Sequence, residues 1–115
     1  MKIRIKDNSV RFRLAQKEVT ELVNDGQTWS KCQFVNGELT YGLMATDTNE
    51  ITSSFEENKV TVQVPKILLK EWDIDERVGF DNTNDGLYIL IEKDWQCLKP
   101  RAHEDESNLY INPQA

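Results

Sequence analysis

The start of the chain alternates between apolar and basic residues, and this alternation constrains the fold more than any other feature. Residues 2–6 and 10–14 both show it, on either side of Asp7-Asn8. A period of two predicts half-buried β-strands, because successive side chains of a strand point to opposite faces of the sheet. If Asp7-Asn8 is a two-residue turn, Arg4 lies opposite Arg11 and every apolar side chain shares one face. Five cations then share the other face: Lys2, Arg4, Lys6, Arg11 and Arg13.

Turn and helix signals divide the rest of the chain. A helix is expected over residues 15–23 with a stop at 24–26, and a second short helix over 65–72. Hairpin turns are expected at Asn36-Gly37 and at Glu57-Asn58, and strands at 77–80 and 87–91 are expected to flank a turn at 81–86. These elements predict an α+β fold: a mainly antiparallel sheet of about seven or eight strands, curled or barrel-like, with two short helices. We find no internal repeat in the sequence.

With 115 residues, the chain is long enough for one domain with a core of its own. We expect this domain to span residues 1–101. Residues 102–115 form an acidic C-terminal tail with a few apolar residues, expected to dock on the domain or on a neighbouring subunit. No apolar run approaches the roughly 20 residues of a membrane span, and the basic start is unlike a signal peptide. The sequence therefore predicts a cytoplasmic protein. In that compartment we expect the two cysteines to be reduced and partly buried.

The charge is unevenly distributed. The formal net charge is −6, yet the first thirteen residues contain five basic groups and one acidic group. The acidic remainder argues against binding to nucleic acid or to anionic membranes, which require clustered cations. For the basic hairpin, the sequence leaves three alternatives: neutralisation by the protein's own carboxylates or by solvent, binding of a phosphate-bearing small ligand or an acidic protein surface, and burial in a homodimer.

Three groups of residues resemble sites that carry chemistry. Residues 81–86 followed by Glu92 come close to a calcium-binding loop, but a strand between them carries Glu92 roughly 20 Å away. The separation of Cys97 from His103 is not a usual spacing for zinc ligands, and neither Cys32 nor Cys97 lies in a context that activates a thiol. The sequence therefore predicts no catalytic residue, no metal and no cofactor.

Three segments together indicate a family: the basic start at residues 1–14, the stretch 54–62, and Glu92-Lys93-Asp94-Trp95-Gln96-Cys97-Leu98. An acidic tail that runs from residue 104 to Asn112-Pro113 is a fourth part of this pattern. The chain resembles, nearly end to end, a group of short uncharacterised bacterial proteins. Its Tyr110-Ile111 stands where those proteins usually have an aromatic-Pro pair. The resemblance implies a bacterial cytoplasmic setting and carries no activity.

The start also has a weaker similarity to the CYTH-type triphosphate enzymes, whose antiparallel tunnel alternates inward-facing charged residues. Their Glu-x-Glu-x-Lys signature is absent, since Lys2, Arg4 and Lys6 occupy the comparable alternation. The sequence therefore favours a non-catalytic binding or interaction module with a basic sheet face. The alternative is a CYTH-like, metal-dependent triphosphate or nucleotide phosphohydrolase.

Overall fold

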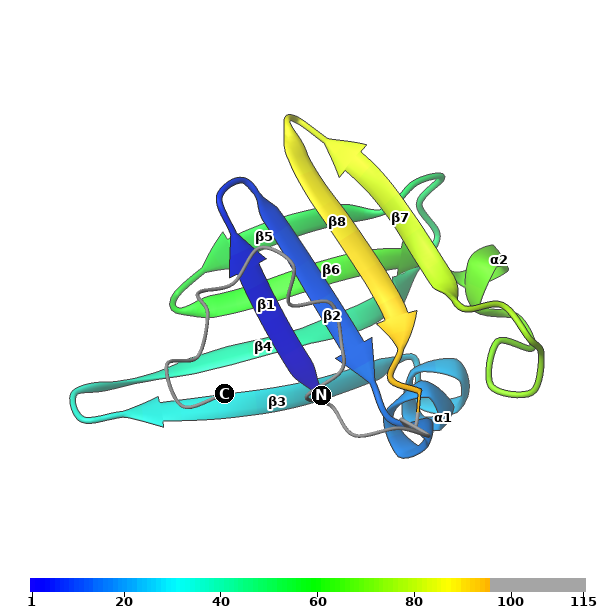
Figure 1. The fold of residues 1–115 in the computed structure, drawn as a ribbon, viewed down its shortest axis with the longest axis horizontal. Helices are drawn as coiled ribbons and strands as arrows, with labels where there is room; N and C mark the ends of the chain where they lie inside the picture. Colours follow the sequence, from blue (N-terminus) through cyan, green and yellow to red (C-terminus); the bar gives the residue numbers. More distant parts are fainter. Residues whose placement is uncertain (96–115) are drawn as a thin grey trace, which may run out of the picture.

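A computed structural model describes residues 1–95, which form two four-stranded sheets whose strands cross obliquely (Figure 1). The first sheet has the order β1-β2-β8-β7 and the second β3-β4-β6-β5. Along the chain the elements are β1 (Lys2–Lys6), β2 (Ser9–Leu14), α1 (Gln16–Asp25), β3 (Gln27–Phe34), β4 (Gly37–Thr46), β5 (Thr52–Glu56), β6 (Lys59–Pro65), α2 (Lys66–Leu69), β7 (Gly79–Asn84) and β8 (Leu87–Lys93).

The sheets are mixed, which corrects the expectation of one large antiparallel sheet. Each contains two antiparallel hairpins joined by a central parallel pair, β2 with β8 and β4 with β6. The strands of residues 1–95 form two separate sheets and no closed barrel. Alternation and turn residues predict hairpins, which are local. They do not specify the distant strand that joins a hairpin on its other side. The α+β class and the two short helices are confirmed, and the eight strands of residues 1–95 agree with the expected seven or eight.

The element order repeats once, although the sequence shows no internal repeat. The series strand, strand, helix, strand, strand describes β1 to β4 with α1, and again β5 to β8 with α2. If each strand is replaced by its counterpart in the other half, the order β1-β2-β8-β7 becomes β5-β6-β4-β3, which is the order of the second sheet read from its other edge. The opposed pair Arg4 and Arg11 of the first hairpin thus corresponds to Ser54 and Thr61 of the third.

The core lies between the two sheets and is closed by the helices. Trp72, after α2, is fully buried, and its ring centroid lies 4.9 Å from that of Phe80. Its indole Nε1 donates a hydrogen bond to the carbonyl oxygen of Arg77 at 2.9 Å, so the polar atom is satisfied. In α1, Val19 and Leu22 are buried, and the helix ends at Gly26 with φ 81°, as its sequence predicts.

Two predicted turns are displaced. The second hairpin turns at Val35-Asn36, because Phe34 pairs with Gly37 and none of these residues has a positive φ. Glycine after such a turn is typical of type I, whereas the predicted type I′ turn needs positive φ at both central residues. The last hairpin turns at Asp85-Gly86, so residues 81–84 belong to a strand. The turn at Glu57-Asn58 is confirmed, with positive φ at both residues.

Candidate functional site

The first hairpin has the predicted register. Lys2 pairs with Arg13, Arg4 with Arg11 and Lys6 with Ser9 around the turn at Asp7-Asn8. Val10, Phe12 and Leu14 are buried in the core, so the cations of β1 and β2 lie on the outer face of the first sheet. We call these five cations the basic face: Lys2, Arg4, Lys6, Arg11 and Arg13.

A carboxylate of β8 pairs with two members of the basic face. Arg11 Nε donates to Glu92 Oε1 at 2.7 Å, and Arg13 Nε donates to the same oxygen at 3.0 Å. Partial burial of Glu92 opposes its ionisation. The hydrogen bonds and charges of Arg13 and Arg11 outweigh this effect and hold the pKa of Glu92 below its usual range. The sequence did not reveal this arrangement, because it depends on the parallel pairing of β2 with β8.

The remaining three cations differ in their surroundings. Lys2 Nζ lies 2.9 Å from Asp94 Oδ2. Arg4 and Lys6 are exposed, and within residues 1–95 no carboxylate oxygen lies within the 4.0 Å of an ion pair from either side chain. Two carboxylates thus pair with three of the five cations: Glu92 is shared by Arg11 and Arg13, and Asp94 pairs with Lys2. The described residues provide no such carboxylate for Arg4 and Lys6.

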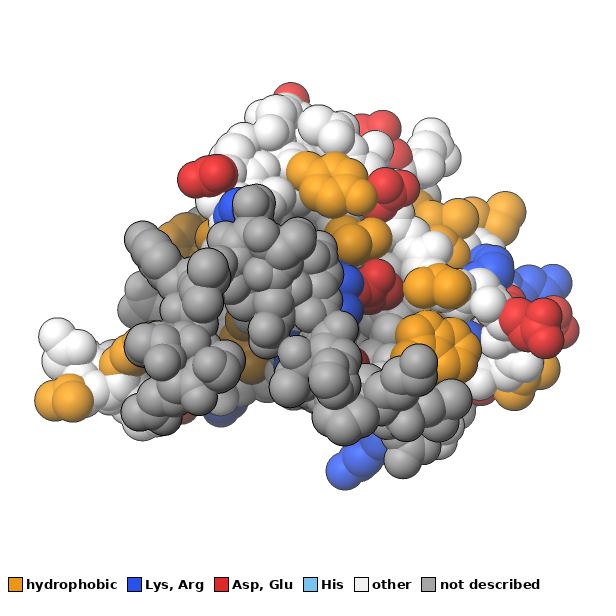
Figure 2. All heavy atoms as spheres, viewed as in Figure 1, with side chains coloured by type: hydrophobic (Ala, Val, Ile, Leu, Met, Phe, Trp, Pro, Cys, Tyr) orange, Lys and Arg blue, Asp and Glu red, His pale blue; other side chains and the backbone are white. Residues whose placement is uncertain are grey.

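The outer face is hollowed beside these two side chains. One shallow hollow of about 260 Å³ is bordered by Arg4, Lys6, Arg11 and Tyr88, and a second of about 340 Å³ extends from Arg4 towards Arg13. Arg4 and Arg11 border both. In Figure 2, which views this face, blue Lys and Arg side chains lie beside a red carboxylate near the middle of the molecule. Both hollows are bordered by several cationic side chains and therefore suit a negatively charged ligand more than an apolar one.

Tyr88 adds a hydroxyl group to the border of the first hollow. Its Oη donates to Asp81 Oδ2 at 2.8 Å. This hydrogen bond, together with partial burial and the nearby charges of Asp81 and Glu92, raises the pKa of Tyr88 above its ordinary value. The phenol therefore stays protonated at neutral pH, and its oxygen still has acceptor capacity for a neighbouring donor.

The third hairpin provides an internal comparison. It has the same length of turn, yet Ser54 and Thr61 stand where the first hairpin has Arg4 and Arg11. The neighbouring pair on the same face, Thr52 and Gln63, is joined by a side-chain hydrogen bond of 3.0 Å. A hairpin with the same turn length and register thus forms in the same protein without the opposed arginines. Folding alone does not explain them, particularly because like charges directly opposite each other are unfavourable.

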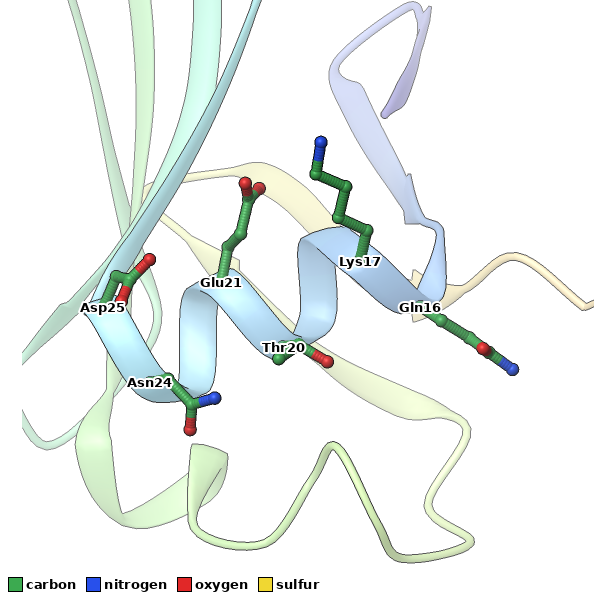
Figure 3. A pocket seen from close by; sticks show the side chains of 6 residues that line it. All are labelled: Gln16, Lys17, Thr20, Glu21, Asn24 and Asp25. Atoms are coloured by element: carbon green, nitrogen blue, oxygen red, sulfur yellow. The ribbon is translucent and has the colours of Figure 1, made fainter.

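A third hollow, of about 460 Å³, lies along α1 and is also polar. Figure 3 shows that its side chains diverge: Lys17 and Glu21 point to one side of the helix, and Thr20 and Asn24 to the other. Glu21 is already engaged, since its Oε1 accepts from Thr28 Oγ1 at 2.9 Å. This hollow is the solvated face of a helix, and nothing in it converges on a ligand.

The other sequence candidates are accounted for as follows. Residues 81–84 lie in β7, and Glu92 bonds arginines, so the calcium-loop pattern is a strand and a turn. Cys32 is exposed, contrary to the expectation of partial burial, whereas Cys97, His103 and the tail lie outside the described residues. Among residues 1–95 no group of three or more His, Cys, Asp or Glu is placed to hold a metal. Neither helix in that range is long and apolar enough to cross a membrane.

Fold and site together define a small α+β protein of two mixed sheets, one of which has an outward basic face. The chain belongs to a family of unknown function, DUF7009, whose model matches residues 1–114. This confirms the resemblance to an uncharacterised family of small proteins, and the matching model is not that of the CYTH-type enzymes. Comparisons with curated proteins and with solved structures gave no match.

Proposed function

We propose that this protein is a non-catalytic binding module whose basic face takes an anionic partner, either a phosphate-bearing small ligand or an acidic protein surface. The observation that carries the proposal is the position of Arg4 and Lys6. Both are exposed beside a hollow, and no carboxylate of residues 1–95 pairs with them.

The chemistry of the hollow supports an anion. A guanidinium offers several N–H donors in a planar fork that matches two oxygens of a phosphate or carboxylate, and Lys6 adds a compact charge. Arg11 borders the same hollow but shares Glu92 with Arg13. An incoming anion would therefore bind first to Arg4 and Lys6. Arg11 would add to the attraction for the anion only to the extent that its guanidinium gives up the ion pair with Glu92.

Calorimetric titration with inorganic tripolyphosphate and with heparin, each at several salt concentrations, tests the proposal. We expect binding that weakens as salt rises, and at least a fivefold loss of affinity in Arg4→Ala and in Lys6→Ala. Lys59→Ala is the matched control, because Lys59 is exposed on β6, in the other sheet. The proposal fails if the wild-type protein shows no salt-sensitive binding, or if the control loses as much affinity as the two variants.

The alternative of a metal-dependent phosphohydrolase makes a different prediction. Such an enzyme would cleave the bound phosphate and would require carboxylates near it for the metal. Incubation of the protein with tripolyphosphate and magnesium or manganese, with release of inorganic phosphate as the readout, separates the two functions: a binding module gives no release above the buffer control. The cytoplasmic location and the bacterial setting stay predictions from the sequence.

A further inference from the structure

β1 is the outer strand of its sheet, with β2 on one side only (Figure 1). In an antiparallel hairpin, hydrogen-bonded and non-hydrogen-bonded pairs alternate, starting from a bonded pair beside the two-residue turn. Arg4 and Arg11 are therefore a bonded pair. By the same alternation, Ile3 and Ile5 direct their N–H and C=O groups to the side of β1 that faces away from β2.

Two of the other edge strands, β7 and β3, have contacts with neighbouring segments among residues 1–95. On β7, Asn82 Nδ2 donates to the carbonyl oxygen of Ile51 at 2.8 Å, so the segment before β5 lies against this edge. At β3, Thr28 bonds to Glu21 of α1, which covers the start of the strand. Near the start of β1, Tyr41 Oη of the second sheet donates a 3.2 Å hydrogen bond to the carbonyl oxygen of Met1, and Ile3 packs against the core. Among residues 1–95, the rest of β1 is open.

The side chains of β1 specify what could pair with it. Lys2, Arg4 and Lys6 alternate along the outer face, while Ile5 on the inner face remains 64% exposed. Lysine on an edge strand disfavours pairing with a second copy of the same strand, because like charges would then lie side by side. A strand with carboxylates on its outer face and apolar side chains on its inner face would instead match both faces.

We infer that β1 accepts an extended acidic segment of a partner protein as an added strand, with carboxylate and apolar residues in alternation. Alternate side chains of a strand are about 6.6 Å apart along its axis, so carboxylates at every second position keep in step with the cations of β1. The apolar residues between them cover Ile5. This inference rests on the proposed function and specifies its partner as a peptide that binds by strand addition.

The probe is the peptide Glu-Val-Glu-Val-Glu with blocked ends, which has the same alternation in either direction. We expect amide hydrogen exchange at Ile3 and Ile5 to slow at least tenfold at saturating peptide, while exchange at Arg4, already bonded within the hairpin, changes little. We expect Ile5→Ser to weaken binding about threefold or more. Because Ile5 is exposed, this variant keeps the fold.

Two N-methylated peptides separate strand addition from simple charge attraction, one methylated at both valines and one at the three glutamates. Both peptides keep the side chains and the charge of the probe. Each lacks the N–H donors along one edge of the peptide strand, because alternate residues direct their N–H groups to the same edge. We expect at least one of them to lose tenfold in affinity. Equal binding of all three peptides, or no slowing at Ile3 and Ile5, overturns the inference. If Arg4→Ala still weakens tripolyphosphate binding in that case, the proposed function stands without strand addition.

Discussion

Arg4 and Arg11 lie directly opposite each other on β1 and β2, yet only Arg11 has a carboxylate partner among residues 1–95. The difference follows from strand order. β8 lies next to β2 and brings Glu92 to Arg11, whereas β1 is one strand further from β8. Among residues 1–95, Glu92 pairs with Arg11 and Arg13, and Asp94 pairs with Lys2, so the positive charge that is left lies at Arg4 and Lys6 of the outer strand.

Removing the charge of Glu92 should strengthen anion binding. In Glu92→Gln, Arg11 and Arg13 lose their shared carboxylate and become available to a ligand. We expect the affinity for tripolyphosphate to rise about fivefold to tenfold, a change of about 1 kcal/mol, measured by calorimetric titration at low salt.

Glu38→Gln is the control for Glu92→Gln, because it removes the same charge from a carboxylate of the other sheet that lies 3.7 Å from Lys31. An equal gain in both variants would mean that net charge, and not the local release of the arginines, sets the affinity.

The same carboxylate should make stability depend on pH. Glu92 has a pKa lowered from its ordinary 4.5, so the unfolded chain takes up a proton at Glu92 at a higher pH than the folded protein does. The stabilisation by Glu92 is thus fully present above about pH 5 and is lost as the pH falls through the lowered pKa.

Urea unfolding between pH 7 and pH 3 measures this effect. We expect Glu92→Gln to be less stable than wild type by about 1 kcal/mol at pH 7, because the pair is partly exposed to solvent. The two stability curves should converge below pH 4. Curves that stay parallel over this range would show that the arginine contacts of Glu92 contribute nothing to the pH dependence.

The hairpins and their faces were predictable because they depend on neighbours in the sequence. Alternation places Val10 inward and Arg11 outward, and a two-residue turn at Asp7-Asn8 pairs Ile5 with Val10, which keeps the apolar side chains on one face. The helix stop at Gly26 is local in the same sense, since its φ of 81° suits glycine. The basic face was therefore located correctly from residue order alone.

The partners of the basic face were not predictable, because they depend on which distant strands meet. Nothing near Glu92 in the sequence indicates that β8 runs parallel to β2. The displaced turn at Val35-Asn36 has a different cause. Asn-Gly favours a turn with two positive φ angles, but the chain uses Gly37 after the turn and pairs it with Phe34.

Arg77 should contribute to stability through its geometry more than its charge. Its Nη1 and Nη2 donate to the carbonyl oxygens of Leu68 and Lys70, both at 2.7 Å, and its Nε donates to Asp75 at 2.6 Å. One planar group thus fixes the segment between α2 and β7. We expect Arg77→Lys to lower the free energy of unfolding by about 1–2 kcal/mol, measured by urea titration at pH 7, because an ammonium group cannot reach all three acceptors. Arg4→Lys, the control, should stay within about 0.5 kcal/mol of wild type, and equal losses in both would contradict this account.

Gly42 should tolerate no side chain. A Cβ built at Gly42 would lie 2.3 Å from the carbonyl oxygen of Thr28 and 2.4 Å from a ring carbon of Trp29, because the indole of β3 lies across the glycine of β4. Lys59 Nζ lies 4.2 Å from the centre of that ring, so the indole is held from a third strand as well.

For Gly42→Ala we expect a loss of about 2–3 kcal/mol in the free energy of unfolding, measured by urea titration, because the indole and the backbone of β3 have to move. Gly37→Ala is the matched control on the same strand. A Cβ at Gly37 meets nothing within 4 Å, and the residue has no positive φ, so its stability should change by no more than about 0.5 kcal/mol. Similar stability of the two variants would show that Trp29 can leave Gly42 at little cost, and the packing of β3 on β4 would then not depend on this contact.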